Sequence, residues 1–230
     1  MTIVVLLPGM DGSGSLFDDF IAALGTRTIT IAYPPDRPLN YEQLERFVES
    51  SLPGEPYILL GESFSGPIAI RLASRCLPNL QAVVLVCTFA TLPGRRAPLW
   101  FRKFAALIPF WRVPVRFGAP ALLGGDHPPA LRTKLLEAVE RVVPSVWRAR
   151  LGAVLDVDVT AELATIRVPI LYLQAERDRV VPQAAAAIIS SQAVHARVVT
   201  ISGPHALLQC RPSQCAAALK VFAGDSGITL

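Results

Sequence analysis

The sequence is poor in the residues that build metal sites and disulfide frameworks. Its four cysteines, Cys76, Cys87, Cys210 and Cys215, form no C-x-x-C pair. None of them has a histidine at the spacing of a metal site. We therefore interpret them as reduced thiols in the core or near the surface, and we predict no metal.

Long hydrophobic runs are also missing. The longest stretch without charge lies between Arg75 and Arg95, but prolines and polar residues interrupt it, so it is not a membrane span. The first residues enter a five-residue apolar run, Ile3 to Leu7, with no basic segment before it. This pattern does not support a secretory signal. We expect a cytoplasmic protein without a transmembrane segment.

The chain also has little excess of one charge sign over the other. The formal net charge is only +4, and no run of lysine and arginine is interleaved with aromatic residues. A nucleic acid partner is therefore not predicted. The length of 230 residues and the 52% hydrophobic content fit one globular α/β domain with a sizeable core.

Short apolar segments alternate with helical patterns over most of the chain, and six of them are predicted strands: 2–7, 28–33, 57–60, 82–87, 169–173 and 197–201. This alternation predicts an α/β fold with a mostly parallel sheet covered by helices on both faces. Between residues 91 and 160 the alternation stops, and the pattern becomes helical and is interrupted by prolines. We interpret 91–160 as an inserted helical cap on a core formed by 1–90 and 161–230.

One serine falls on a strand-to-helix turn, in Gly61-Glu62-Ser63-Phe64-Ser65-Gly66. Such a turn, a nucleophile elbow, strains the backbone of the serine and tolerates only small residues two positions before and after it. Gly61 and Ser65 occupy those positions. The usual G-x-S-x-G pattern has glycine where Ser65 stands, and here the glycine follows at Gly66. Ser63 is the predicted nucleophile.

A serine nucleophile needs a histidine base to take its proton. Only three histidines are present. His127 falls in the predicted cap, and His195 precedes the last strand, at the wrong edge of the sheet. His205 follows that strand at the carboxyl edge, where open α/β sheets bind ligands, so it is the predicted base.

The base in turn needs a carboxylate that orients it. Asp178 follows the preceding strand and lies between the serine and the histidine in chain order, as the elbow pattern requires. Glu176 is its nearest competitor, while Asp156 and Asp158 are weaker because they precede that strand. A helix N-terminal carboxylate with no catalytic part is the plain alternative for Asp178.

A glycine-rich loop, residues 8–14, follows the first strand. Its spacing is not G-x-G-x-x-G, and no acidic residue closes a second strand at the distance a ribose would require. The alternative is an oxyanion-hole loop, whose backbone N–H groups face a reacting carbonyl. We favour this second interpretation.

Together, the elbow, Asp178 with Val180-Val181-Pro182 after it, and Gly203-Pro204-His205 resemble the α/β-hydrolase fold over nearly the whole chain. The resemblance implies that the N–H groups of Met10 and Phe64 form the oxyanion hole, although proline stands at position 8 where the family often has histidine. It also implies a shortened sheet of about six strands, because the family's first antiparallel pair is missing. No cofactor is implied.

The function that follows is a serine carboxylesterase acting through an acyl-enzyme. Thioester hydrolysis and acyl transfer use the same intermediate, and a small-ligand receptor on the same scaffold is an alternative of another class. Small hydrolases of the pimeloyl-carrier-protein methyl esterase type are similar in size, in triad order and in their basic cap.

The predicted cap concentrates positive charge, with eleven lysines and arginines against five acidic residues between 91 and 160. It also carries Trp100, Phe104 and Trp111. Two anionic partners would fit, an acidic acyl carrier protein or a lipid surface, and we favour the carrier. A solvated basic face without a partner is the simpler explanation.

Overall fold

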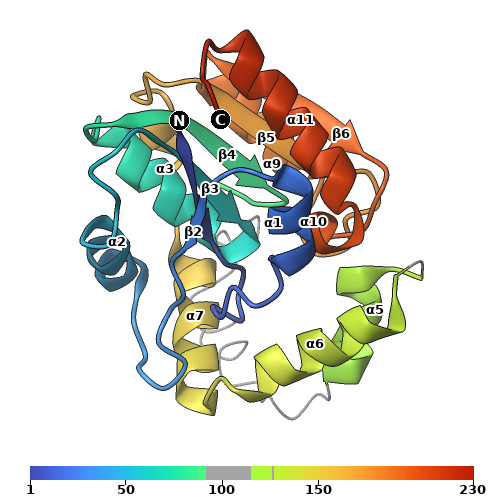
Figure 1. Cartoon of the computed structure of the whole chain (residues 1–230). Coiled ribbons are helices and arrows are strands. Elements are labelled where there is room, and N and C mark those ends of the chain that lie inside the picture. The colour runs from blue at the N-terminus through green and yellow to red at the C-terminus, as the bar shows by residue number, and fades with distance from the viewer. Residues whose placement is uncertain (92–114, 126) are drawn as a thin grey trace.

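The computed structural model describes residues 1–91, 115–125 and 127–230, and its centre is a single parallel sheet (Figure 1). Six strands, β1 (Ile3–Leu7), β2 (Thr28–Thr30), β3 (Tyr57–Glu62), β4 (Leu80–Val86), β5 (Ile170–Ala175) and β6 (Ala196–Ile201), lie in the order β2-β1-β3-β4-β5-β6. Every neighbouring pair is parallel. The predicted fold class and the six-stranded sheet are confirmed.

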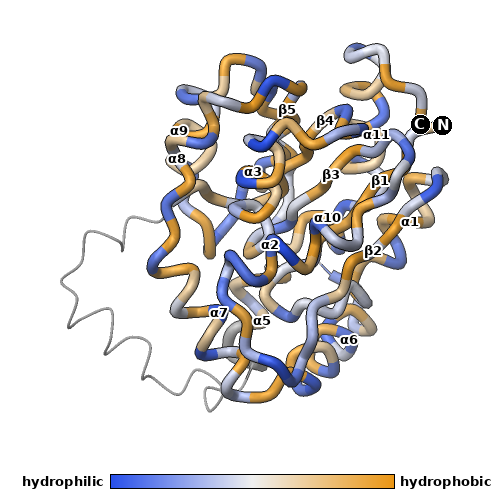
Figure 2. The backbone as a smooth tube through the Cα atoms, turned by 90° about the vertical axis from the view of Figure 1, so that its left-hand side faces the viewer, coloured by the Kyte–Doolittle hydropathy of each residue, from blue (hydrophilic) through white to orange (hydrophobic). Residues whose placement is uncertain are grey.

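Helices cover both faces of the sheet, because successive side chains of a strand point to opposite faces and both sets are apolar here. Val4 and Leu6 pack with α1 (Asp18–Leu24), α10 (Leu207–Cys210) and α11 (Pro212–Asp225). On the other face, Val5 and Leu7 pack with α2 (Tyr41–Glu49), α3 (Gly66–Ser74), α8 (Thr160–Leu163) and α9 (Ala184–Gln192). Figure 2 shows the resulting hydrophobic residues along the strands.

One strand is shorter than its pattern predicts. The apolar segment 28–33 was expected to be extended throughout, but β2 ends at Thr30. Beyond it, the N–H of Tyr33 donates to the carbonyl of Gly12 over 2.7 Å, so this end of the segment leaves the sheet and joins the loop after β1. The buried Tyr33 therefore belongs to the environment of the loop 8–14.

Between β4 and β5 the described chain is helical, in α5 (Val115–Leu123), α6 (Pro129–Glu140), α7 (Pro144–Asp156) and α8. Figure 1 shows α5, α6 and α7 below the sheet, on the side where β1 ends. The N–H of Ala206, in the segment after β6, donates to the carbonyl of Leu122 in α5 over 2.8 Å. These helices thus lie over the carboxyl edge of the sheet, whereas the division into core and cap stays a prediction. Trp100, Phe104 and Trp111 lie outside the described residues.

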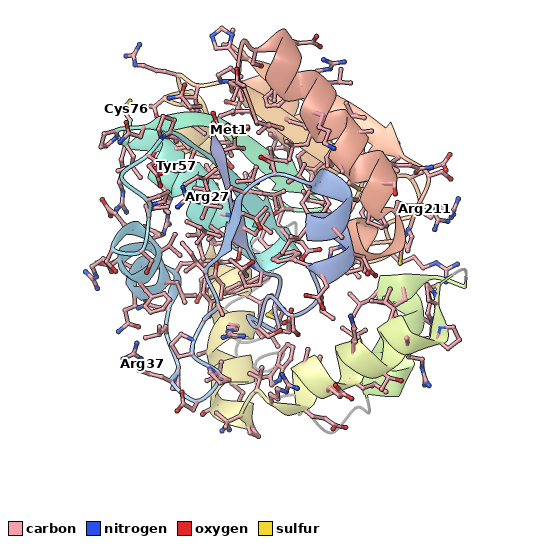
Figure 3. All side chains as sticks on the ribbon, viewed as in Figure 1. Met1, Arg27, Arg37, Tyr57, Cys76 and Arg211 are labelled. Atoms are coloured by element: carbon pink, nitrogen blue, oxygen red, sulfur yellow. The ribbon has the colours of Figure 1, made fainter. Side chains whose placement is uncertain are left out.

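The structure also shows the state of the cysteines and the lengths of the described helices. All four cysteines are free; Cys76 is exposed on the outer surface (Figure 3), and the other three are buried. Within the described residues, no helix combines the length and apolarity needed to cross a membrane.

Candidate active site

The turn between β3 and α3 holds Ser63 in a strained conformation. Its φ is +48°, in the left-handed region that non-glycine residues rarely adopt. The chain passes through a single 3-10 turn, Ser63–Ser65, and enters α3 at Gly66. A Cβ atom at Gly61 would lie 2.8 Å from the carbonyl oxygen of Ser65, so position 61 requires glycine. This is the geometry that the elbow pattern predicts.

The departure of the motif at Ser65 has a structural explanation. The Ser65 side chain is buried, and its hydroxyl donates to the carbonyl of Pro8. The Tyr33 hydroxyl lies 2.6 Å from Oγ of Ser65. Ser65 thus links the elbow to the loop after β1. The glycine is needed one residue later, because a Cβ atom at Gly66 would lie only 1.9 Å from Oγ1 of Thr88.

Three side chains form a continuous hydrogen-bond chain at the carboxyl edge of the sheet. Oγ of Ser63 lies 2.9 Å from Nε2 of His205, and Nδ1 of His205 lies 2.9 Å from Oδ2 of Asp178. These are the three residues that chain order predicts for nucleophile, base and acid.

The competing residues lie elsewhere. Glu176 is exposed beside Arg177, at 3.5 Å, and Asp158 binds the hydroxyl and the N–H of Thr160. His195 is exposed ahead of β6, at the amino edge.

Asp178 stays charged although it is nearly buried. Burial is the largest single effect and opposes the charge, but the hydrogen bond from His205, the electrostatic interaction with it and two backbone N–H groups together place the pKa of Asp178 below its usual value. The N–H groups of Val180 and Val181 each donate to Oδ1 over 2.8 Å and act in the same direction. The carboxylate is therefore held as an acceptor facing Nδ1 of His205.

Ser63 and His205 line a small cavity of about 100 Å³, together with Met10 of the loop 8–14. Most of its remaining wall is apolar and includes Leu16, Leu122, Leu135, Val139, Trp147 and Ala206. Phe64, the other residue predicted for the oxyanion hole, directly follows Ser63, and its ring is buried and stacks on Tyr41 with centroids 4.9 Å apart.

Comparisons with known proteins agree with this fold. The model of the alpha/beta hydrolase family matches residues 4–218. The chain belongs to the alpha/beta hydrolase family.

The individual proteins that resemble this hydrolase share only a small part of its sequence. The biotin biosynthesis bifunctional protein BioHC of Cellvibrio japonicus (strain Ueda107) is 28% identical over 186 residues, which are 76% of this chain and 36% of that protein. The chain thus spans about a third of that relative's length. Two similar solved structures are the enol-lactonase of Burkholderia xenovorans LB400 (TM-score 0.84, 18% identity, 97% of this chain and 91% of that chain covered) and the esterase EaEST of Exiguobacterium antarcticum (0.83, 16%, 97% and 92%).

A buried acid next to the serine was not singled out from the sequence. Glu62 is 8% exposed and lines the cavity; Oε1 accepts from Nε2 of Gln209 in α10 over 2.9 Å, and the carboxylate also accepts from the N–H of Gly9. Burial raises the pKa of Glu62 to about 7, and the negative charge of Asp11 adds to the shift. In the sequence Glu62 is only the variable position of the elbow motif, so its pattern carries no signal.

A buried arginine of α7 was interpreted wrongly. Arg150 was counted with the positive charges of the predicted cap, but it is only 2% exposed. It donates to the carbonyls of Met10 and Pro34. It is therefore removed from the set of residues that a partner could contact.

One group of side chains in the described residues has the composition of a metal site. Ligand atoms of Cys87, Asp178 and His205 lie within 4.8 Å of one another. Nδ1 of His205 is already bonded to Asp178, and burial raises the pKa of the Cys87 thiol, which keeps it protonated. Metal binding would have to displace the hydrogen bond that orients His205.

Proposed function

We propose that this hydrolase is a serine carboxylesterase. The observation that carries the proposal is the chain of hydrogen bonds from Ser63 through His205 to Asp178, combined with the positive φ of Ser63. A serine hydroxyl becomes a useful nucleophile when a neutral histidine nitrogen accepts its proton. The depressed pKa of Asp178 supports the same assignment, because an ionised carboxylate keeps the proton of His205 on Nδ1 and leaves Nε2 free to accept.

The reaction would proceed in two halves. Oγ of Ser63 attacks the ester carbonyl while Nε2 of His205 takes its proton, and the oxyanion that forms is stabilised by the N–H groups of Met10 and Phe64. His205 then gives the proton to the departing alcohol, which leaves an acyl group on Ser63. A water molecule then attacks the acyl carbonyl while His205 takes its proton, and His205 returns that proton to Oγ of Ser63 as the bond between Oγ and the acyl group breaks and the acid leaves.

The apolar wall of the cavity favours the binding of a neutral, apolar group of the substrate. Leu122, Leu135, Val139 and Trp147 come from α5, α6 and α7 and face the same cavity as Ser63. A small apolar pocket favours compact acyl or alcohol groups through the burial of their hydrocarbon surface. We therefore expect short p-nitrophenyl esters to be turned over faster than long ones.

The test combines that ester series with substitutions at the three residues. We expect Ser63→Ala and His205→Ala each to lower kcat by about 10⁴-fold or more, and Asp178→Asn by a similar or somewhat smaller factor, because such residues act as a unit. Glu176→Gln, which changes an exposed acid two residues from Asp178, is the matched control and should leave kcat within about twofold. Full activity in folded Ser63→Ala would exclude the proposal.

Two alternatives share this site. Hydrolysis of acyl thioesters uses the same acyl-enzyme, so thioesters belong in the substrate panel. A small-ligand receptor would bind members of the panel without turning them over, and labelling of Ser63 by a fluorophosphonate with no turnover of any ester would favour it.

A more specific candidate is the ester of an acyl group carried on an acyl carrier protein, of the pimeloyl-carrier-protein methyl ester type. The match to a protein whose name places it in biotin biosynthesis favours this candidate. Comparing kcat/KM for a carrier-bound methyl ester with that for the free methyl ester tests it. A preference below about tenfold for the bound form would favour a general esterase.

A further inference from the structure

The loop after β1, residues 8–14, is held by hydrogen bonds to three successive carbonyl groups. Ser65 of the elbow donates to Pro8, and the N–H of Gly12 donates to the carbonyl of Gly9 over 3.0 Å. Nη1 of Arg150 donates to the carbonyl of Met10 over 2.7 Å. Of these three donors, only Arg150 comes from the segment between β4 and β5.

These bonds determine where the N–H of Met10 points. In a trans peptide the carbonyl of one residue and the N–H of the next point in opposite directions, so the bond to the Gly9 carbonyl sets the direction of the Met10 N–H. The bond from Arg150 fixes the following peptide plane. With both planes fixed, the backbone of Met10 has little freedom left.

The site around the guanidinium group is built for an arginine. Nη2 donates to the carbonyl of Pro34 over 3.2 Å, and the guanidinium carbon lies 5.8 Å from the centre of the Tyr33 ring. The charge of Asp11 favours the charged form, although burial, the larger effect, lowers the pKa of Arg150. A lysine has a single point charge on a flexible stem and would not bind both carbonyls in the same geometry.

Gly12 is also adapted to this arginine. Its φ is +72°, and a Cβ atom there would lie 2.6 Å from Nη1 of Arg150. Glycine is thus required both by the backbone conformation and by the close approach of the guanidinium group. Loop and helix fit one another at this point.

We propose that Arg150 is a positioning residue, which holds the loop 8–14 in the conformation that presents the Met10 N–H to the oxyanion. This inference rests on the proposed function and deepens it. Trp147 lies one turn earlier on the same helix and lines the cavity at Ser63. Helix α7 therefore links the wall that contacts the substrate to the loop that stabilises the transition state.

The test compares Arg150→Met, which keeps an apolar stem without the guanidinium group, with Arg150→Lys. The number of active sites is titrated with a fluorophosphonate, so that misfolded protein does not enter kcat. We expect Arg150→Met to lower kcat by about ten- to a hundredfold, with KM changed by less than about threefold, since the loss of one oxyanion donor costs about 10²–10³. Affinity for a boronic acid, which forms a tetrahedral adduct on serine, should fall with kcat/KM.

Arg37→Met is the matched control, because Arg37 is exposed in the segment after Pro34 (Figure 3). It should change neither kcat nor boronate affinity. A merely structural role for Arg150 would lower the melting temperature and the active fraction but leave kcat per titrated site unchanged, and that result would overturn the proposal. If Arg150→Met does not fold, wild-type kcat and boronate affinity in Arg150→Lys would overturn it equally. Activity in Ser63→Ala, by contrast, would reject the esterase itself.

Discussion

At the scale of single residues, buried polar side chains connect the loops that surround Ser63. Ser65, Arg150 and Glu62 are all buried, and each is hydrogen-bonded to a group on another segment. Sequence patterns treat charged residues as exposed, which is the reason that Arg150 was assigned to the surface. Its partners explain its burial: two backbone carbonyls, the Tyr33 ring and the charge of Asp11, all distant in sequence, become adjacent to it only in the fold.

Glu62 leads to a prediction about stability and pH. Its pKa is about 7 in the folded protein against an ordinary 4.5, so the folded state binds more protons than the unfolded state between these values. The contribution of Glu62 to stability therefore falls as pH rises through this window. Glu62→Gln removes this dependence. We therefore expect the free energy of unfolding of Glu62→Gln, relative to that of the wild type, to rise by up to about 3 kcal/mol between pH 4.5 and pH 8.

Urea denaturation across that pH range checks the prediction. Glu137→Gln changes an exposed glutamate of α6 and should run parallel to the wild type at every pH. Parallel curves for Glu62→Gln as well would show that Glu62 is ionised at its ordinary pKa.

At the scale of elements, periodic patterns predicted the sheet well. Apolar segments of the right length became the six strands. The strands β1, β3, β4 and β5 are almost wholly buried, and burial on both faces produces a continuous apolar run in the sequence. The edge strands β2 and β6 are less buried. The pattern failed at Tyr33, whose apolar ring resembles a strand residue but packs beside the loop 8–14. Ser63, Asp178 and His205 each follow a strand, and they meet at one edge because the carboxyl ends of parallel strands all lie there. The buried polar residues around them, such as Glu62 and Arg150, belong to no periodic pattern and could not be predicted in this way.

The start of α3 offers a test of how tightly the elbow packs on the sheet. A Cβ atom at Gly66 meets Thr88 at 1.9 Å, whereas one at Gly152 in α7 meets nothing within 4 Å. We expect Gly66→Ala to destabilise the protein by about 2–4 kcal/mol, because Thr88 itself donates to the carbonyl of Ser63 and has little room to move. Gly152→Ala should stabilise it by about 0.5–1 kcal/mol, as alanine does inside helices.

Thermal unfolding of the two variants beside the wild type measures this contrast. Equal melting temperatures for Gly66→Ala and Gly152→Ala would mean that the elbow relaxes freely.

At the scale of the whole molecule, the structure shows which of the described basic residues between 91 and 160 a partner could contact. Among the eleven basic residues between 91 and 160, four lie in the described part of the chain and are exposed: Arg132, Lys134, Arg141 and Arg148. Lys134 forms an ion pair with Asp18 over 3.1 Å. Arg150 faces inward, and the others lie where no side chains are described. A partner attracted by this charge would therefore meet the exposed arginines of α6 and α7 and of the turn between them.

We predict that an acidic acyl carrier protein docks on these exposed arginines. Reversing Arg132, Arg141 and Arg148 to glutamate, with Arg150 kept, should lower kcat/KM for a carrier-bound ester by about tenfold or more at low salt, since opposite charges raise encounter rates. The loss should shrink at high salt, where charges are screened, and the free ester should be unaffected. The same change of charge at Arg27, Arg167 and Arg197, which lie at the amino ends of β2, β5 and β6, is the matched control. Equal losses on both substrates, or none on either, would refute docking and leave the esterase proposal untouched, because the free ester reports on Ser63 alone.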